Sequence, residues 1–89
     1  MKYKINKGFI SQKMGKKMTI FDGEESKLYN FNETAVFIFE KLKKGLDEID
    51  IIDLLVTKFK TGKGKVEKDV KETIDELLKN KIISSLKQK

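Results

Sequence analysis

The fold is decided by the stretch KLYNFNETAVFIFEKL, residues 27–42, in which the spacing of apolar side chains changes halfway along. At its start, Tyr29 and Phe31 share one face while Leu28 and Asn30 share the other, and this two-residue period predicts a β-strand. From Asn32 onward the period is helical: apolar residues at 35, 38, 39 and 42 have the spacing of one helix face. The stretch therefore predicts a strand that leads directly into a helix.

Two further strands are predicted before residues 27–31. Residues 9–14 and 17–21 have β character and are separated by a turn at Gly15. A second turn begins at Asp22-Gly23, a strong turn dipeptide. Three short strands joined by tight turns predict an antiparallel meander with two open edges.

Three helices are predicted after the strands. Asn32 suits the N-cap of the first, and Lys43-Lys44-Gly45 suits its end. Asp47 can cap a second helix over 48–59, residues 61–65 are expected to form a flexible loop, and a third helix is expected over 66–80. Strands followed by helices indicate an α+β domain, with the helices packed on a three-stranded antiparallel sheet, and one domain is expected over 1–89. The side chains expected to face the core are Ala35, Ile38, Phe39, Leu42, Ile51, Ile52, Leu55, Phe59, Val70, Ile74, Leu77, Ile82 and Ile83.

The composition argues against catalysis. The 89 residues include no cysteine and no histidine, so thiol chemistry, histidine-based acid–base catalysis and the usual zinc sites are excluded. Lys63-Gly64-Lys65 lacks the flanking residues of a phosphate-binding loop. We expect a protein that is not an enzyme, with no catalytic residue, no metal and no cofactor.

The net charge is +6, and the excess lies in residues 1–31, which contain seven lysines and three acidic residues. A basic balance favours acidic partners. The longest unbroken apolar run, residues 35–39, is far too short to span a membrane, and the N-terminus lacks the apolar segment of a signal peptide. A cytoplasmic protein without a membrane partner is therefore expected.

Two binding functions remain open. A helix-turn-helix made by the second and third helices is one, but residues 66–80 carry three lysines against five acidic residues, and DNA repels a negative helix. All 20 basic residues are lysine, which also disfavours a specialised nucleic-acid reader. The other function is peptide binding: an edge strand at 27–31 offers free main-chain groups, and Asp69, Thr73 and Glu76 on the third helix are free to form a facing wall.

The ordered motifs of the chain resemble the PqqD-like family. The resemblance lies in the run from Leu28 to Ala35, the following Ile38-Phe39-Glu40-Lys41-Leu42, the apolar helix around residues 51–55, the Asp69-Val70 pair and the closing Ile82-Ile83. It covers residues 8–84. Phe31 replaces the leucine usual in the family before Asn32, and the substitution keeps the apolar bulk.

The resemblance implies a winged helix-turn-helix fold and a role in recognising ribosomally made precursor peptides. The leader segment of the precursor is expected to add as an antiparallel strand and to be presented to a modifying enzyme, such as a radical S-adenosylmethionine enzyme, a cyclodehydratase or a leader peptidase. Leu28 and Ile20 are expected to contribute apolar pockets, and the lysine-rich N-terminal third to attract an acidic leader. The implied peptide-binding residues are Lys27, Leu28, Tyr29, Asn30, Phe31, Asp69, Val70, Thr73, Ile74 and Leu77.

Two alternatives stay open beside leader binding. One is a winged-helix DNA-binding protein. The other is a structural subunit whose apolar edge joins a partner enzyme without contacting any peptide.

Overall fold

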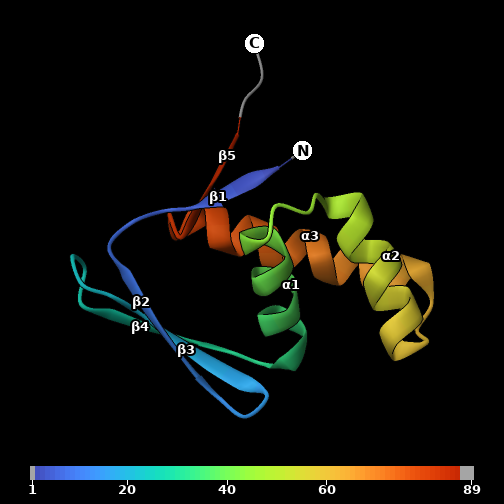
Figure 1. Ribbon diagram of the computed structural model, residues 1–89, viewed down its shortest axis with the longest axis horizontal. Coiled ribbons are helices and arrows are strands. Elements are labelled where there is room, and N and C mark those ends of the chain that lie inside the picture. The colour runs from blue at the N-terminus through green and yellow to red at the C-terminus, as the bar shows by residue number, and fades with distance from the viewer. Residues whose placement is uncertain (1, 87–89) are drawn as a thin grey trace.

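Strands and helices are segregated along most of the chain, as the sequence predicts (Figure 1). The structure is a computed structural model and describes residues 2–86. A three-stranded antiparallel sheet precedes three helices, which confirms the predicted α+β architecture. In chain order the elements are β1 (Tyr3–Ile5), β2 (Phe9–Met14), β3 (Lys17–Asp22), β4 (Lys27–Phe31), α1 (Glu33–Lys43), α2 (Glu48–Phe59), α3 (Lys63–Lys79) and β5 (Ile83–Ser85).

Strands β2, β3 and β4 form the predicted meander, in which each strand pairs with the next along the chain. Gly15, with a φ of +62°, takes the left-handed conformation required by the two-residue turn between β2 and β3. The turn before β4 is held by Asp22, whose carboxylate accepts hydrogen bonds from the backbone N–H of Glu24 at 3.0 Å and of Glu25 at 3.2 Å. These two turns fix the register of the sheet.

A second, two-stranded sheet joins the ends of the chain and was absent from the sequence prediction. Its strands β1 and β5 run antiparallel, with Tyr3 opposite Ser85 and Ile5 opposite Ile83. Strands of three residues are too short to show a period, and their pairing spans nearly the whole chain. The apolar tail at Ile82 and Ile83 packs on the core as predicted, and both residues are buried.

The first two helices begin at the predicted caps. The Asn32 side-chain oxygen accepts a hydrogen bond of 2.9 Å from the backbone N–H of Ala35. The Asp47 carboxylate accepts one of 3.0 Å from the backbone N–H of Asp50. This hydrogen bond lowers the pKa of Asp47 below its usual value. Helix α1 ends at Lys43, and Gly45 follows with a φ of +93°, a conformation that favours glycine.

Helix α3 begins earlier than predicted, and the expected loop over residues 61–65 is correspondingly short. The helix starts at Lys63, and the backbone N–H of Val66 donates a hydrogen bond of 3.2 Å to the carbonyl of Gly62. Two glycines and the lack of an acidic first turn favour a loop here. Burial of Val66 in the core overrides that preference.

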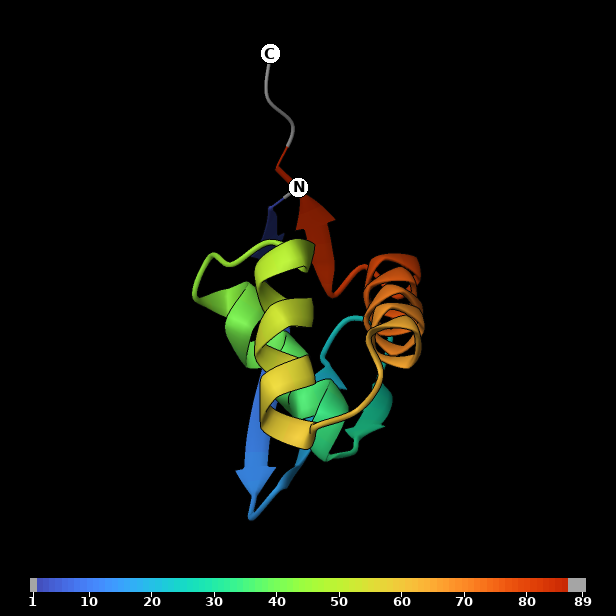
Figure 2. The ribbon, with the colours of Figure 1, turned by 90° about the vertical axis from the view of Figure 1, so that its right-hand side faces the viewer.

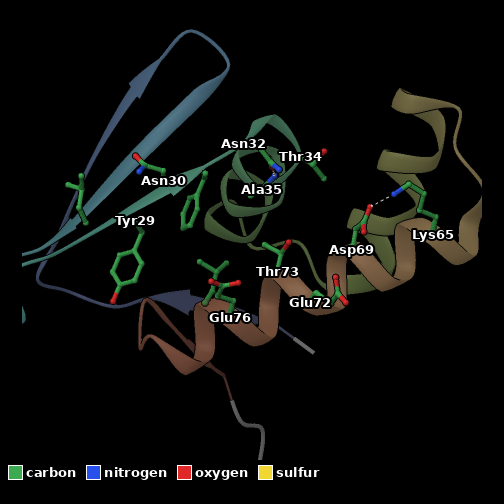
Figure 3. A pocket seen from close by; sticks show the side chains of 13 residues that line it. Tyr29, Asn30, Asn32, Thr34, Ala35, Lys65, Asp69, Glu72, Thr73 and Glu76 are labelled. Atoms are coloured by element: carbon green, nitrogen blue, oxygen red, sulfur yellow. Dashed lines mark hydrogen bonds and ion pairs between the residues drawn. The ribbon is translucent and has the colours of Figure 1, made fainter.

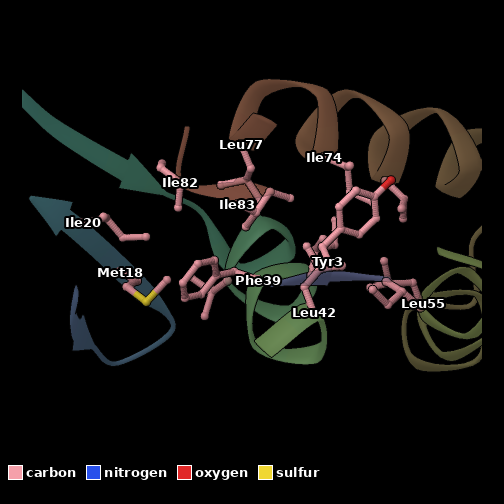
Figure 4. Packing of buried hydrophobic residues seen from close by; sticks show 14 of the residues in the cluster. Tyr3, Met18, Ile20, Phe39, Leu42, Leu55, Ile74, Leu77, Ile82 and Ile83 are labelled. Atoms are coloured by element: carbon pink, nitrogen blue, oxygen red, sulfur yellow. The ribbon is translucent and has the colours of Figure 1, made fainter. Parts of the chain in front are cut away.

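The hydrophobic core lies where the inner face of the sheet meets the three helices (Figure 4). Met18 and Ile20 point into it from β3, Leu42 from α1 and Leu77 from α3. A fully buried leucine or isoleucine stabilises the fold by roughly 1.5–3 kcal/mol. Two expected core residues differ. Phe59, the last residue of α2, is 37% exposed, because the helix end extends past the core. Ala35 is half-buried and lies outside the core cluster.

No helix within residues 2–86 is long and apolar enough to cross a membrane.

Candidate functional site

Strand β4 is an edge strand of the three-stranded sheet. It pairs with β3 on one side, and within residues 2–86 no strand pairs with its other side. Figure 2 shows β4, in teal, on the same side of the molecule as α3, in orange. An unpaired edge presents main-chain N–H and C=O groups that an extended peptide can bond.

The register of the sheet identifies which groups face the open edge. The two-residue turn joins Met14 and Lys17, and such a turn closes on a hydrogen-bonded pair. Pairs alternate from there, so β3 uses Met18, Ile20 and Asp22 to bond β4. Their partners on β4 are Phe31, Tyr29 and Lys27. The main-chain groups of Leu28 and Asn30 therefore point toward the open edge.

A groove of about 700 Å³ separates the open edge of β4 from α3 (Figure 3). Tyr29 and Phe31 are half-buried along the strand side, and the Phe31 ring packs 6.3 Å from the ring of Phe39. Thr73 and Glu76 face the groove from α3. The residues that line it are Leu28, Tyr29, Asn30, Phe31, Asn32, Thr34, Ala35, Lys65, Asp69, Glu72, Thr73, Glu76 and Leu77.

The helix side of the groove is built by the periodicity of α3. Its buried stripe consists of Val66, Val70, Ile74 and Leu77. Positions 69, 72, 73 and 76 form a neighbouring stripe at helical spacing and are half-buried or exposed. Packing of the first stripe on the core therefore turns the second stripe toward β4.

Seven of the ten expected binding residues line this groove: Leu28, Tyr29, Asn30, Phe31, Asp69, Thr73 and Leu77. Lys27 lines a neighbouring cavity instead. Val70 and Ile74 are 0% and 2% exposed and point into the core, so they support the wall without forming its surface. Ile20 was expected to contribute a pocket, but it is fully buried on the inner face of β3.

Several lining residues were missed by sequence reasoning. Glu72 lies three positions after Asp69, so the helical period contained the signal for it. Lys65 was assigned to a loop, which hid its place on the same stripe. Asn32, Thr34 and Ala35 line the end of the groove where β4 passes into α1. This end of the groove is formed by the packing of β4 against α1, which the spacing of residues in the sequence does not indicate.

The helix side of the groove is acidic. Asp69, Glu72 and Glu76 line it with one cation, Lys65, whose Nζ lies 3.5 Å from the Asp69 carboxylate. Within residues 2–86, Glu72 and Glu76 form no ion pair. The expectation of an acidic partner came from the lysines of the N-terminal third, and the charge at the groove itself has the opposite sign.

A second cavity of about 300 Å³ continues from the other end of β4. Tyr29 lines both cavities, so they lie on either side of this residue along the strand. The charged residues of the second cavity are Lys7, Lys27, Lys79, Lys81, Asp22, Glu24 and Glu25. The lining of this cavity thus carries a net charge of +1 and that of the groove −2, so the charge changes sign along the edge of β4.

The charge of α3 differs from the sequence count. Its full span adds Lys63 and Lys65 to the count over residues 66–80, so five lysines and five acidic residues make the helix neutral. A neutral helix whose groove face is acidic is still poorly suited to the DNA major groove. Within residues 2–86, no group of three or more acidic side chains is placed to hold a metal ion.

The chain is similar to one protein family and to solved structures that share its fold. The family described as coenzyme PQQ synthesis protein D (PqqD) matches residues 17–83. No curated protein sequence matches the chain. One similar solved structure is described as TbiB1 in complex with the TbiA(beta) leader peptide: it is 14% identical, with a TM-score of 0.85 over 96% of this chain and 99% of that one. Another is lasso peptide synthetase B1 complexed with the leader peptide: it is 18% identical, with a TM-score of 0.86 over 96% of this chain and 100% of that one.

Proposed function

The chain belongs to the PqqD family, and from this premise we propose that it binds the leader segment of a ribosomally synthesised precursor peptide. The leader adds as an antiparallel strand to β4 and lies in the groove against α3. The observation that carries the proposal is the open edge of β4 beside a groove of about 700 Å³. The protein acts as a peptide chaperone and catalyses no reaction itself.

The energetics require side-chain contacts in addition to strand pairing. Main-chain hydrogen bonds to Leu28 and Asn30 each contribute only ~1 kcal/mol net. Ordering a flexible leader offsets much of that gain. Apolar leader side chains that contact Tyr29 and Phe31 supply the remainder, at ~25 cal/mol for each Å² of apolar surface buried.

The proposed binding residues come from two elements. Strand β4 contributes its edge, and α3 contributes the facing wall, with Val70 and Ile74 holding that wall on the core. The two solved relatives with leader peptides support this placement because they share the fold. The residues proposed to contact the leader are Lys27, Leu28, Tyr29, Asn30, Phe31, Asp69 and Thr73, and Leu77 lies buried at the base of the groove.

The bound leader leaves the rest of the precursor free for modification. We propose that the partner enzyme is a peptide-modifying enzyme, of the radical S-adenosylmethionine, cyclodehydratase or leader-peptidase class. The single core of residues 2–86 then serves as one peptide-recognition domain.

The test is a titration with a short precursor peptide, to be sought among the reading frames that neighbour the gene for this chain. Fluorescently labelled leader and core halves are added separately to the full chain, and anisotropy is measured. The proposal predicts saturable binding of the leader half and none of the core half. A scrambled leader of equal composition is the control.

Two other outcomes would identify different functions. Retention of duplex DNA at moderate salt, without precursor binding, would identify a DNA-binding protein. Association with the modifying enzyme, without binding of either peptide half, would identify a structural subunit.

A further inference from the structure

The groove that we propose for the leader has two ends of unlike charge. On the α1 side of Tyr29, three carboxylates face one lysine. On the other side, four lysines and three acidic residues give the lining a net charge of +1. A peptide lying along β4 therefore meets a negative potential at one end and a positive one at the other.

The negative end has one paired carboxylate and two unpaired ones within residues 2–86. Lys65 pairs with Asp69, whereas Glu72 and Glu76 form no ion pair within the part of the chain that the structure describes. These two glutamates are four residues apart on one helix face and both are exposed, so they repel one another. A cation bound between β4 and α3 relieves that repulsion.

The register of β4 determines which peptide side chains reach these groups. Facing residues of paired strands have their side chains on the same side of a sheet. Peptide residues opposite Phe31, Tyr29 and Lys27 therefore direct their side chains to the same inward face as these three residues. Peptide residues opposite Leu28 and Asn30 point to the other face. Alternate residues of the peptide therefore enter the groove.

Antiparallel pairing sets the order of those residues. Strand β4 runs from the lysine-rich cavity toward the acidic one, because Lys27 lines the first and Phe31 the second. An antiparallel peptide runs the opposite way. Its first groove-facing residue lies near the carboxylates, the next lies opposite Tyr29, and the third lies near the lysines.

We propose that the groove selects leader segments with a lysine or arginine two residues before an apolar residue, and that an acidic residue two positions further on is favoured. The apolar side chain lies opposite Tyr29, the cation pairs with Glu72 and Glu76, and the acidic group lies near Lys27 and Lys79. This inference rests on the proposed function and adds the chemistry and direction of the peptide that it binds.

The test is selection from a displayed library of random 12-residue peptides, with the full chain as bait. Enriched peptides are expected to carry lysine or arginine two residues before an apolar residue. One exposed ion pair changes affinity by roughly two- to fivefold, so each selection round enriches the pattern by about that factor. In selections with Glu76→Lys, the preference for a cation is expected to disappear.

Glu67→Lys is the matched control, because Glu67 is exposed on α3, lines neither cavity and undergoes the same change of charge. Peptides selected with Glu67→Lys are expected to show the same preference for a cation as peptides selected with the unchanged chain. Enriched peptides with no cation at that position, or with an unchanged cation preference for Glu76→Lys, would overturn the inference and leave peptide binding intact. A bait that enriches no peptide would overturn both.

Discussion

Tyr29 lies directly opposite Ile20 in the β3–β4 pair, yet the two residues have different environments. Ile20 is fully buried, whereas Tyr29 is half-buried and lines both cavities along the free edge of β4. Within this pair of strands, β3 therefore packs in the core, while β4 borders the groove. This arrangement lets the binding edge be changed without removing the core.

Replacement of Asn30 by proline tests the role of the strand edge. The register directs the N–H of Asn30 away from β3, so Asn30→Pro removes a donor from the open edge without breaking the β3–β4 ladder. We expect leader affinity to fall by about fivefold or more, because one hydrogen bond contributes ~1 kcal/mol net. Calorimetric titration measures the change.

Asn30→Ala is the control for that substitution. Like Asn30→Pro, it removes the hydrogen bond of 3.1 Å that the Thr19 hydroxyl donates to the Asn30 side chain. Unlike Asn30→Pro, it keeps the backbone N–H of residue 30. Equal affinities of the proline and alanine variants would show that the edge donor does not contribute to binding.

Filling the groove from the helix side is expected to block the leader. Thr73 is half-buried and lines the groove, so the indole of Thr73→Trp occupies space needed by leader side chains. We expect a loss on the order of tenfold in affinity, equivalent to about 1.4 kcal/mol. Lys71→Trp places the same side chain on an exposed site of α3 that lines neither cavity, and its affinity is expected to match the unchanged chain.

The stability of the fold is expected to depend on Tyr3 at high pH. The Tyr3 hydroxyl donates a hydrogen bond of 2.7 Å to the Glu48 carboxylate, and burial together with this contact raises the pKa of Tyr3 from 10.0 to about 12. Below pH 10 the tyrosine is neutral in both the folded and the unfolded chain, and its contribution to the free energy of unfolding is complete. Between pH 10 and pH 12 the unfolded chain loses the proton first, so the free energy of unfolding falls.

The expected loss is about 2–3 kcal/mol, at about 1.4 kcal/mol for each pKa unit. Urea unfolding at several pH values measures it. Tyr3→Phe lacks the ionisable group, so the difference between the two proteins isolates Tyr3 from the lysines that titrate in the same range. Identical pH dependence in both would contradict the role of Tyr3.

The C-terminal segment is expected to be essential for stability. Ile82 is 0% exposed, and removing such a side chain from a core costs roughly 2–5 kcal/mol. Ile82→Ala is therefore expected to lower the thermal midpoint strongly. Leu86→Ala changes a side chain that is 44% exposed, and its midpoint is expected to stay within a few degrees of the original. Differential scanning calorimetry compares the two.

The sequence was sufficient to predict the elements with clear periods and caps. The change of period at Asn32, the apolar stripes of the helices and the turns at Gly15 and Asp22 correctly placed β2, β3, β4, α1 and α2. The small β1–β5 sheet was missed because neither three-residue strand has a readable period. Its pairing depends on the chain ends meeting over the core.

The site was partly predictable because α3, like the other helices, has a clear period. The period of α3 indicated the wall at Asp69 and Thr73 and the core positions of Val70 and Ile74, whereas the family resemblance also implied that Val70 and Ile74 contact the peptide; both are buried. The sign of the groove charge was not evident from net charge, since the lysine excess and the carboxylates of α3 lie in different parts of the chain.

Hydrogen–deuterium exchange at single-residue resolution tests strand addition at β4 most directly. The full chain is measured with and without saturating leader peptide, and anisotropy confirms that the peptide is bound. Our account predicts slower exchange at the backbone amides of Leu28 and Asn30, with Tyr29, already bonded to β3, changing little. Unchanged exchange at Leu28 and Asn30 in the saturated complex would contradict it.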